Sequence, residues 1–215
     1  MIAIARMAVL DLRSVAPYRN QGIVMFGLEV LLFANKPTAL VPALVLLFTS
    51  QIAAYPFNIA DKAGLETLYA VLPLPRRSVL YGHYAWAVAS FLATAAVGTT
   101  LALLLARAQG VPFDGRTLVT VLTLSWALFA INVSIQFPLF IQFGYTRTSA
   151  LGTTLPLMLV VGVVVRLHLT VASIQSWLPL FWVASVAAIM ASAAVTTTAD
   201  RRRVPGAGQY ATPRR

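Results

Sequence analysis

The chain has 215 residues, of which 59% are hydrophobic and only 10% charged, and its formal net charge is +10. Soluble domains carry about 25% charged residues, so this composition excludes a water-covered globular surface and indicates a protein that faces lipid. The absence of cysteine excludes disulfides and thiolate chemistry, and basic residues scattered between apolar runs argue against a nucleic-acid partner.

The first element is a stretch before Pro17 that mixes apolar and charged residues. Arg6, Asp11 and Arg13 interrupt any continuous apolar core, so the stretch does not read as a signal peptide. We expect an interfacial helix in the headgroup plane that leads into the first membrane span. An ordinary frayed terminus is the alternative.

Six apolar segments follow, each near the length of about 20 residues that crosses a bilayer core of about 30 Å. They must be helical, because lipid offers no partner for free backbone N–H and C=O groups. The sequence therefore predicts an all-α, polytopic membrane protein, with a single transmembrane domain over residues 1–200 and a basic tail over residues 201–215. The expected spans are Asn20–Asn35, Pro37–Phe57, Val79–Ala106, Leu118–Phe140, Leu151–Leu167 and Trp177–Ala199.

Six spans place both termini on one side of the membrane, and basic residues decide which side that is. Twelve lysines and arginines share the side of the termini and four lie on the other. We therefore predict a multi-pass protein of a bacterial plasma membrane with both termini cytoplasmic. The loops Asn58–Arg77 and Gln142–Arg147 are cytoplasmic in this arrangement.

The loop between the second and third spans contains a short amphipathic helix. Its apolar residues recur at i, i+3, i+4 and i+7, which places them on one helical face. Asp61 is the expected N-cap, and Pro73 ends the helix. A helix of two turns is marginal alone, so it must dock, either on a partner outside the bilayer or on its own bundle and lipid. The apolar face consists of Leu65, Leu68, Tyr69 and Leu72.

The second cytoplasmic turn is rich in aromatic residues. Gly144 permits a tight turn, and the aromatic side chains around it are typical of a collar at a membrane interface. A simple aromatic belt accounts for most of this pattern. The collar residues are Phe137, Phe140, Phe143 and Tyr145.

Polar side chains within the spans are candidates for a cargo path. Glu29 lies ten positions after Arg19, and ionisable residues inside a membrane are functional candidates by default. It faces either a cavity that attracts cationic cargo or the outer surface beside Lys36. In the fourth span Ser125, Asn132 and Gln136 share one face, which favours bonds between helices over cargo contact, and Gln51 in the second span has the same two interpretations.

Two stretches resemble the membrane subunits of type-2 ABC exporters, in the small six-span branch that includes staphylococcal modulin peptide exporters. One is DKAGLETLYAVLPLPRRSVLYGHY, Asp61–Tyr84, and the other is QFPLFIQFGYTR, Gln136–Arg147. The resemblance has one departure, because His83 stands where the pattern commonly has a lysine.

The resemblance implies that Leu65–Leu72 is a coupling helix that inserts into a groove of a cytoplasmic ATPase. It also implies that the turn Phe143–Arg147 is a second contact, that the stretch before Pro17 is a connecting helix, and that His168–Ser176 is half-buried on the outer side. The ATPase contacts that follow are Asp61, Leu65, Glu66, Leu68, Tyr69, Leu72, Arg76, Arg77, Phe143, Tyr145 and Arg147.

The chain has no P-loop, because neither Lys36 nor Lys62 follows a glycine-rich turn. We therefore expect a non-catalytic permease that binds no cofactor or metal, while a separate ATP-binding subunit holds ATP and Mg. The expected cargo is amphipathic or hydrophobic, such as a peptide, drug or lipid. A second copy of the chain or a paralogous permease, together with membrane lipid, completes the expected partners. The alternative function is a non-transporting scaffold or immunity protein.

Overall fold

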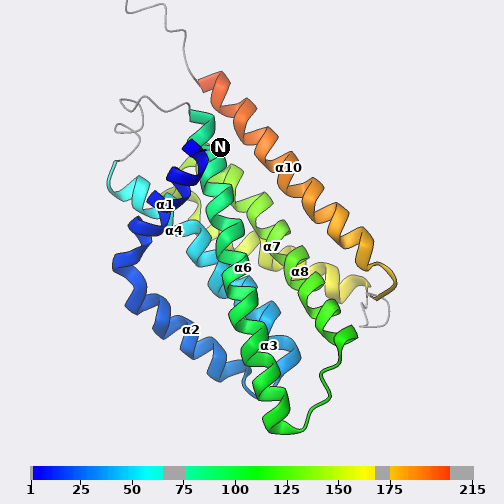
Figure 1. Ribbon diagram of the computed structural model, residues 1–215. Helices are drawn as coiled ribbons and strands as arrows, with labels where there is room; N and C mark the ends of the chain where they lie inside the picture. The colour runs from blue at the N-terminus through cyan, green and yellow to red at the C-terminus, as the bar shows by residue number, and fades with distance from the viewer. Residues whose placement is uncertain (1, 65–75, 168–174, 204–215) are drawn as a thin grey trace, which may run out of the picture.

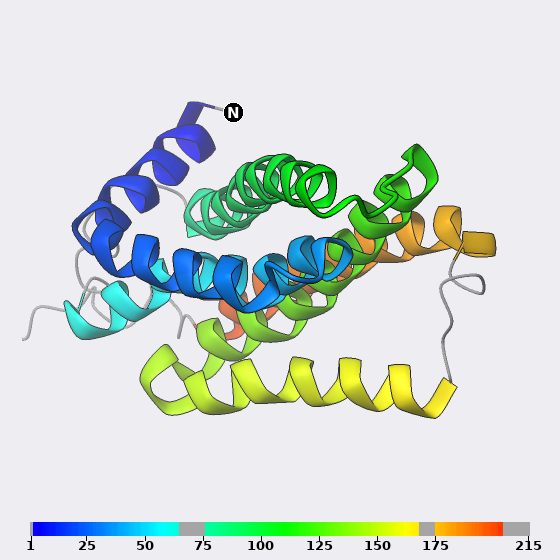
Figure 2. The same ribbon diagram turned by 90° about the horizontal axis from the view of Figure 1, so that it is seen from below.

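The computed structural model describes residues 2–64, 76–167 and 175–203, which form helices and no strands. The helices pack as one elongated bundle, with α1 and α2 along one edge and α10 along another (Figures 1 and 2). In chain order they are α1 (Ile2–Val15), the 3₁₀ turn η1 (Ala16–Tyr18), α2 (Arg19–Phe33), α3 (Pro37–Leu44), the π-helical η2 (Val45–Thr49), α4 (Ser50–Lys62), α6 (Arg76–Gln109), α7 (Gly115–Phe143), α8 (Tyr145–Leu167) and α10 (Leu178–Arg203).

Four helices are long and apolar enough to cross a membrane. They are Pro37–Lys62, Arg77–Gln109, Gly115–Phe143 and Leu178–Thr198, which match the predicted second, third, fourth and sixth spans. Three of them run several residues beyond the predicted bounds, because a helix does not end where its apolar run ends. At 15 residues, α2 is about 22 Å long and falls short of a core of about 30 Å. The count of six spans stays a prediction.

The helix over Pro37–Lys62 changes from α-helical to π-helical winding and back near its middle. Residues Val45–Thr49 are π-helical between α3 and α4, and the hydroxyl of Ser50 donates a 2.5 Å hydrogen bond to the Leu46 carbonyl. The side-chain amide of Asn132, from α7, donates to the same Ser50 hydroxyl. Single π-helical turns within α-helices are rare, and the bond from α7 reaches the residue directly after this turn. Asn132 thus joins two helices, as its polar face in the sequence suggested.

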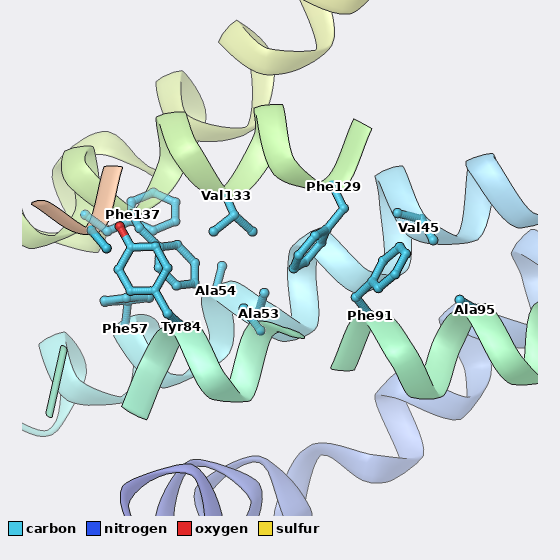
Figure 3. Close-up of a cluster of buried hydrophobic side chains, with 13 residues drawn as sticks. Val45, Ala53, Ala54, Phe57, Tyr84, Phe91, Ala95, Phe129, Val133 and Phe137 are labelled. Carbon is cyan, nitrogen blue, oxygen red and sulfur yellow. The ribbon is translucent and has the colours of Figure 1, made fainter. Parts of the chain in front are cut away.

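A buried aromatic cluster fills the centre of the bundle (Figure 3). Phe57 from α4 contacts Phe137 of α7 with ring centroids 4.9 Å apart, and Tyr84 of α6 contacts the same ring at 4.8 Å. The prediction of an aromatic collar at the membrane interface is therefore wrong for Phe137 and Phe140, which are 0% and 3% exposed. Both rings lie on the face of α7 that packs against α4, where each contacts the ring of Phe57.

Candidate functional site: the Asp61 end of the bundle

The loops gather at two ends of the bundle. The Asp61 end holds the end of α4, the start of α6 and the turn between α7 and α8, whereas the Lys36 end holds the α2–α3 turn and the α6–α7 loop (Figure 1). At the Lys36 end, the Gln109 side-chain amide donates to the Ala34 carbonyl at 2.7 Å. The described parts of the two loops predicted to be cytoplasmic, residues 58–64, 76–77 and 142–147, lie at the Asp61 end.

The carboxylate of Asp61 joins two segments that are 85 residues apart. Its Oδ2 accepts a hydrogen bond from the backbone N–H of Thr146 at 2.7 Å and another from the Thr146 hydroxyl. Thr146 is the second residue of α8, so the carboxylate caps the start of that helix, where free N–H groups favour a negative charge. The end of α4 is thereby held against the α7–α8 turn.

This contact corrects the predicted role of Asp61 as the N-cap of the next helix. Asp61 instead lies in the last turn of α4, which continues to Lys62. Gly64 lies two residues after the end of the helix, and its φ of +62° suits a residue without a side chain. The sequence pattern could not distinguish a cap for the following helix from a cap for α8.

The turn between α7 and α8 is built around Gly144. Its φ of +83° and ψ of 151° lie in a region that residues with a side chain rarely adopt. On either side of this glycine, Phe143 is exposed, while Tyr145 is half-buried with its ring 5.0 Å from that of Phe140. The turn therefore presents an apolar side chain outward while anchoring itself inward.

Several exposed basic side chains lie at the same end of the bundle as this turn. Lys62, Arg77 and Arg147 are exposed, and Arg147 directly follows the residue that bonds Asp61. Lys62 follows the residue that bonds Thr146, so we call the exposed residues Lys62, Phe143 and Arg147 the Arg147 face. This face combines positive charge with one large apolar ring. Exposed aromatic and arginine side chains of this kind are enriched at protein interfaces.

Helix α1 is docked on the start of α6. Met7 is 1% exposed, and a Cβ atom on Gly82 would lie 2.4 Å from the Met7 Cβ, so only glycine permits this approach. One turn further, the Asp11 carboxylate pairs with Nδ1 of His83 at 2.8 Å, with both groups buried. The sequence suggested a helix in the headgroup plane. The structure shows one face of α1 packed on the bundle and Val9, Leu10 and Leu12 exposed.

Five of the predicted ATPase contacts lie outside the described residues. They are Leu65, Glu66, Leu68, Tyr69 and Leu72, together with Pro73. Arg76 is the first residue of α6. The structure instead identifies three partners that sequence reasoning missed, namely Thr146, Asp11 and Ser50. Of these three, only Asp11 could have been recognised from the sequence as a paired residue, because an acid in an apolar stretch needs a partner.

The predicted cargo-path residues are buried or half-buried. Glu29 is 7% exposed, and its carboxyl approaches the backbone N–H of Phe48 in η2. Its two predicted positions, at a cavity or near the outer membrane surface beside Lys36, stay predictions. Asn132 and Gln136 are buried, and Gln51 is half-buried. Two oxygens, Oε2 of Glu29 and Oε1 of Gln136, have no hydrogen-bond partner among the described residues. Within the same residues, no group of three His, Asp or Glu side chains could hold a metal ion.

The comparison with protein families decides the class. The family described as ABC-2 family transporter protein matches residues 9–199. The chain belongs to this family. Comparison with curated proteins and with solved structures found no match. The match covers α2 to α8 completely, with half of α1 and most of α10, so this ABC-2 permease carries the family's membrane domain over nearly its whole length. Membership implies a partner subunit that binds ATP.

Proposed function

We propose that this ABC-2 permease is an exporter of amphipathic or hydrophobic cargo, driven by an ATPase that docks on the Asp61 end of the bundle. The Asp61–Thr146 contact carries the proposal. It holds together parts of the two segments to which the family resemblance assigned ATPase binding, so a push on either segment reaches both α4 and α8. Helix α1 is linked to the same end of the bundle because it is docked on the start of α6.

The proposed topology has six spans, with the Asp61 end in the cytoplasm. Basic residues support this orientation, because Lys62, Arg77 and Arg147 lie at the Asp61 end while Lys36 and Arg107 lie at the other. Since the chain has no cysteine, single cysteines report sidedness cleanly. In intact cells, an impermeant maleimide should label Asn35→Cys and spare Lys62→Cys. The reverse labelling would invert the topology.

ATPase binding is tested with two matched charge substitutions at exposed apolar positions. Phe143→Asp lies on the Arg147 face and Val111→Asp lies at the Lys36 end, and both side chains are exposed, so neither change buries a charge. Phe143→Asp should abolish co-purification of the ATP-binding subunit, whereas Val111→Asp should leave it intact. Leu68→Asp, in the predicted coupling helix, should act like Phe143→Asp.

The outcomes separate the competing functions. If Phe143→Asp and Leu68→Asp both retain the ATPase, the docking surface is wrong. If the wild-type chain captures no ATP-binding subunit, the scaffold or immunity function replaces the exporter. If an amphipathic peptide stimulates ATP hydrolysis by the reconstituted complex no more than a hydrophilic peptide of equal length, the cargo class is wrong. Crosslinking between two tagged copies tests the proposed permease dimer.

A further inference from the structure

A groove of about 340 Å³ lies between α2 on one side and η2 and α4 on the other, with residues from α1, η1 and α6 completing its wall. This volume falls at the lower end of the range of about 300 to 1,000 Å³ that is typical of small-molecule sites. We call it the Arg19 groove, after the one charged residue that lines it. None of the predicted cargo-path residues lines it.

The groove changes character along its length. At one end, Tyr18 and Tyr55 stack with ring centroids 5.6 Å apart, beside the exposed Arg19. At the other end, the rings of Phe26 and Phe48 meet at 5.1 Å. Because α2 and α4 run in opposite directions, these contacts set two levels. They are eight residues apart along η1 and α2 and seven apart along η2 and α4, or about 10 to 12 Å.

The level of the groove that holds Tyr18, Tyr55 and Arg19, its polar level, has the side chains typical of a membrane interface. Tyrosines gather where the apolar body of the ring meets lipid and the hydroxyl meets water, and arginine binds phosphate through a planar array of N–H donors. Below this level, Gly22 leaves room beside the ring of Phe48, whose nearest atom would be 4.0 Å from an added Cβ. The groove therefore offers a cationic entrance above an apolar slot.

We propose that the Arg19 groove binds an anionic phospholipid, with one acyl chain in the slot and the headgroup phosphate on Arg19. Charge complementarity selects this occupant, since the lining includes one arginine and no acidic residue. The occupant would lie between α2 and α4 and so fix the angle between the short α2 and the rest of the bundle. This site goes beyond the proposed export function and does not depend on it.

The test measures lipid binding to the purified full-length chain by native mass spectrometry. The probes are phosphatidylglycerol and phosphatidylcholine with identical acyl chains, added to the delipidated protein in detergent. Gly22→Leu fills the slot, and Gly27→Leu is its control, because Gly27 lies on the same helix outside the groove with open space around it. Gly22→Leu should lose the bound lipid, while Gly27→Leu should retain it.

Arg19→Gln tests the headgroup contact without threatening the fold, because the side chain is exposed. It should lower the preference for phosphatidylglycerol over phosphatidylcholine about fivefold, the ratio expected from one arginine near anionic lipid. Arg116→Gln, exposed near the Lys36 end, should leave the preference unchanged.

Four results would overturn the assignment. The first is equal lipid occupancy in Gly22→Leu and Gly27→Leu. The second is a headgroup preference that survives Arg19→Gln. The third is unchanged lipid occupancy in Gly22→Leu with loss of cargo-stimulated ATP hydrolysis, which assigns the groove to cargo. The fourth is unchanged lipid occupancy in Gly22→Leu with loss of the dimer on size-exclusion chromatography, which assigns the groove to a second copy of the chain.

Discussion

The pair formed by Asp11 and His83 should contribute measurably to the stability of the bundle. The two groups are 3% and 5% exposed and 2.8 Å apart. Removing one partner of a buried hydrogen bond leaves the other unpaired, at a cost of about 1 to 3 kcal/mol. We therefore expect Asp11→Ala and His83→Phe each to lower the free energy of unfolding by about that amount. Phenylalanine keeps the ring that packs at 4.7 Å on Phe57.

The double variant distinguishes a true pair from two separate losses. Replacing both partners by apolar groups removes the unpaired polar atom, so Asp11→Ala with His83→Phe should cost less than the sum of the single changes by about 1 to 3 kcal/mol. The assay is reversible unfolding in mixed micelles with increasing denaturing detergent, followed by tryptophan fluorescence. As a control, Asp11→Ala should add to Thr123→Val, whose hydroxyl accepts from Trp182 between α7 and α10.

A coupling below about 0.5 kcal/mol would refute the reasoning, because residues without a shared contact are additive to that level. It would mean that packing, such as that of Met7 on Gly82, holds α1 on the bundle without help from the buried pair. A large coupling would establish that α1 is tied to α6 through this pair.

Three further predictions concern other contacts. Ser50→Ala and Asn132→Ala should each lower the free energy of unfolding by about 0.5 to 2 kcal/mol and be non-additive in the same assay, because each removes one interhelical hydrogen bond; additive losses would contradict the bond. Gly144→Ala should cost about 1 to 3 kcal/mol through backbone strain at φ +83° and weaken ATPase capture, whereas Gly115→Ala, at the start of α7 with open space around it, should change neither. The hydroxyl and backbone N–H of Thr117 hold the pKa of the Asp114 carboxyl below its usual value, so its stabilising effect is complete above the unfolded pKa of about 3.9 and is lost as pH falls through the folded pKa. The protection factors of the amides at the start of α7, which are corrected for intrinsic exchange rates, should therefore fall in acid, and Asp114→Ala should abolish that fall.

The sequence alone could predict the class and most of the fold. Lipid leaves backbone groups no partner outside a helix, so each long apolar run had to be helical, and the four spans that the structure supports were found within a few residues. The absence of a P-loop from 215 residues led to the prediction of a separate ATP-binding subunit, which membership of the ABC-2 family also implies. These inferences depend only on local composition and on the solvent that surrounds the protein.

Only the tertiary structure decided which side chains meet. Asp61 was assigned to the wrong helix end, and its partner Thr146 was missed, because a contact across 85 residues leaves no trace in local spacing. Phe137 and Phe140 were placed at the interface although they form the core. The physical reason is that a helix apolar on every side fits lipid and protein equally well, so its rotation about its own axis is set by packing against its neighbours.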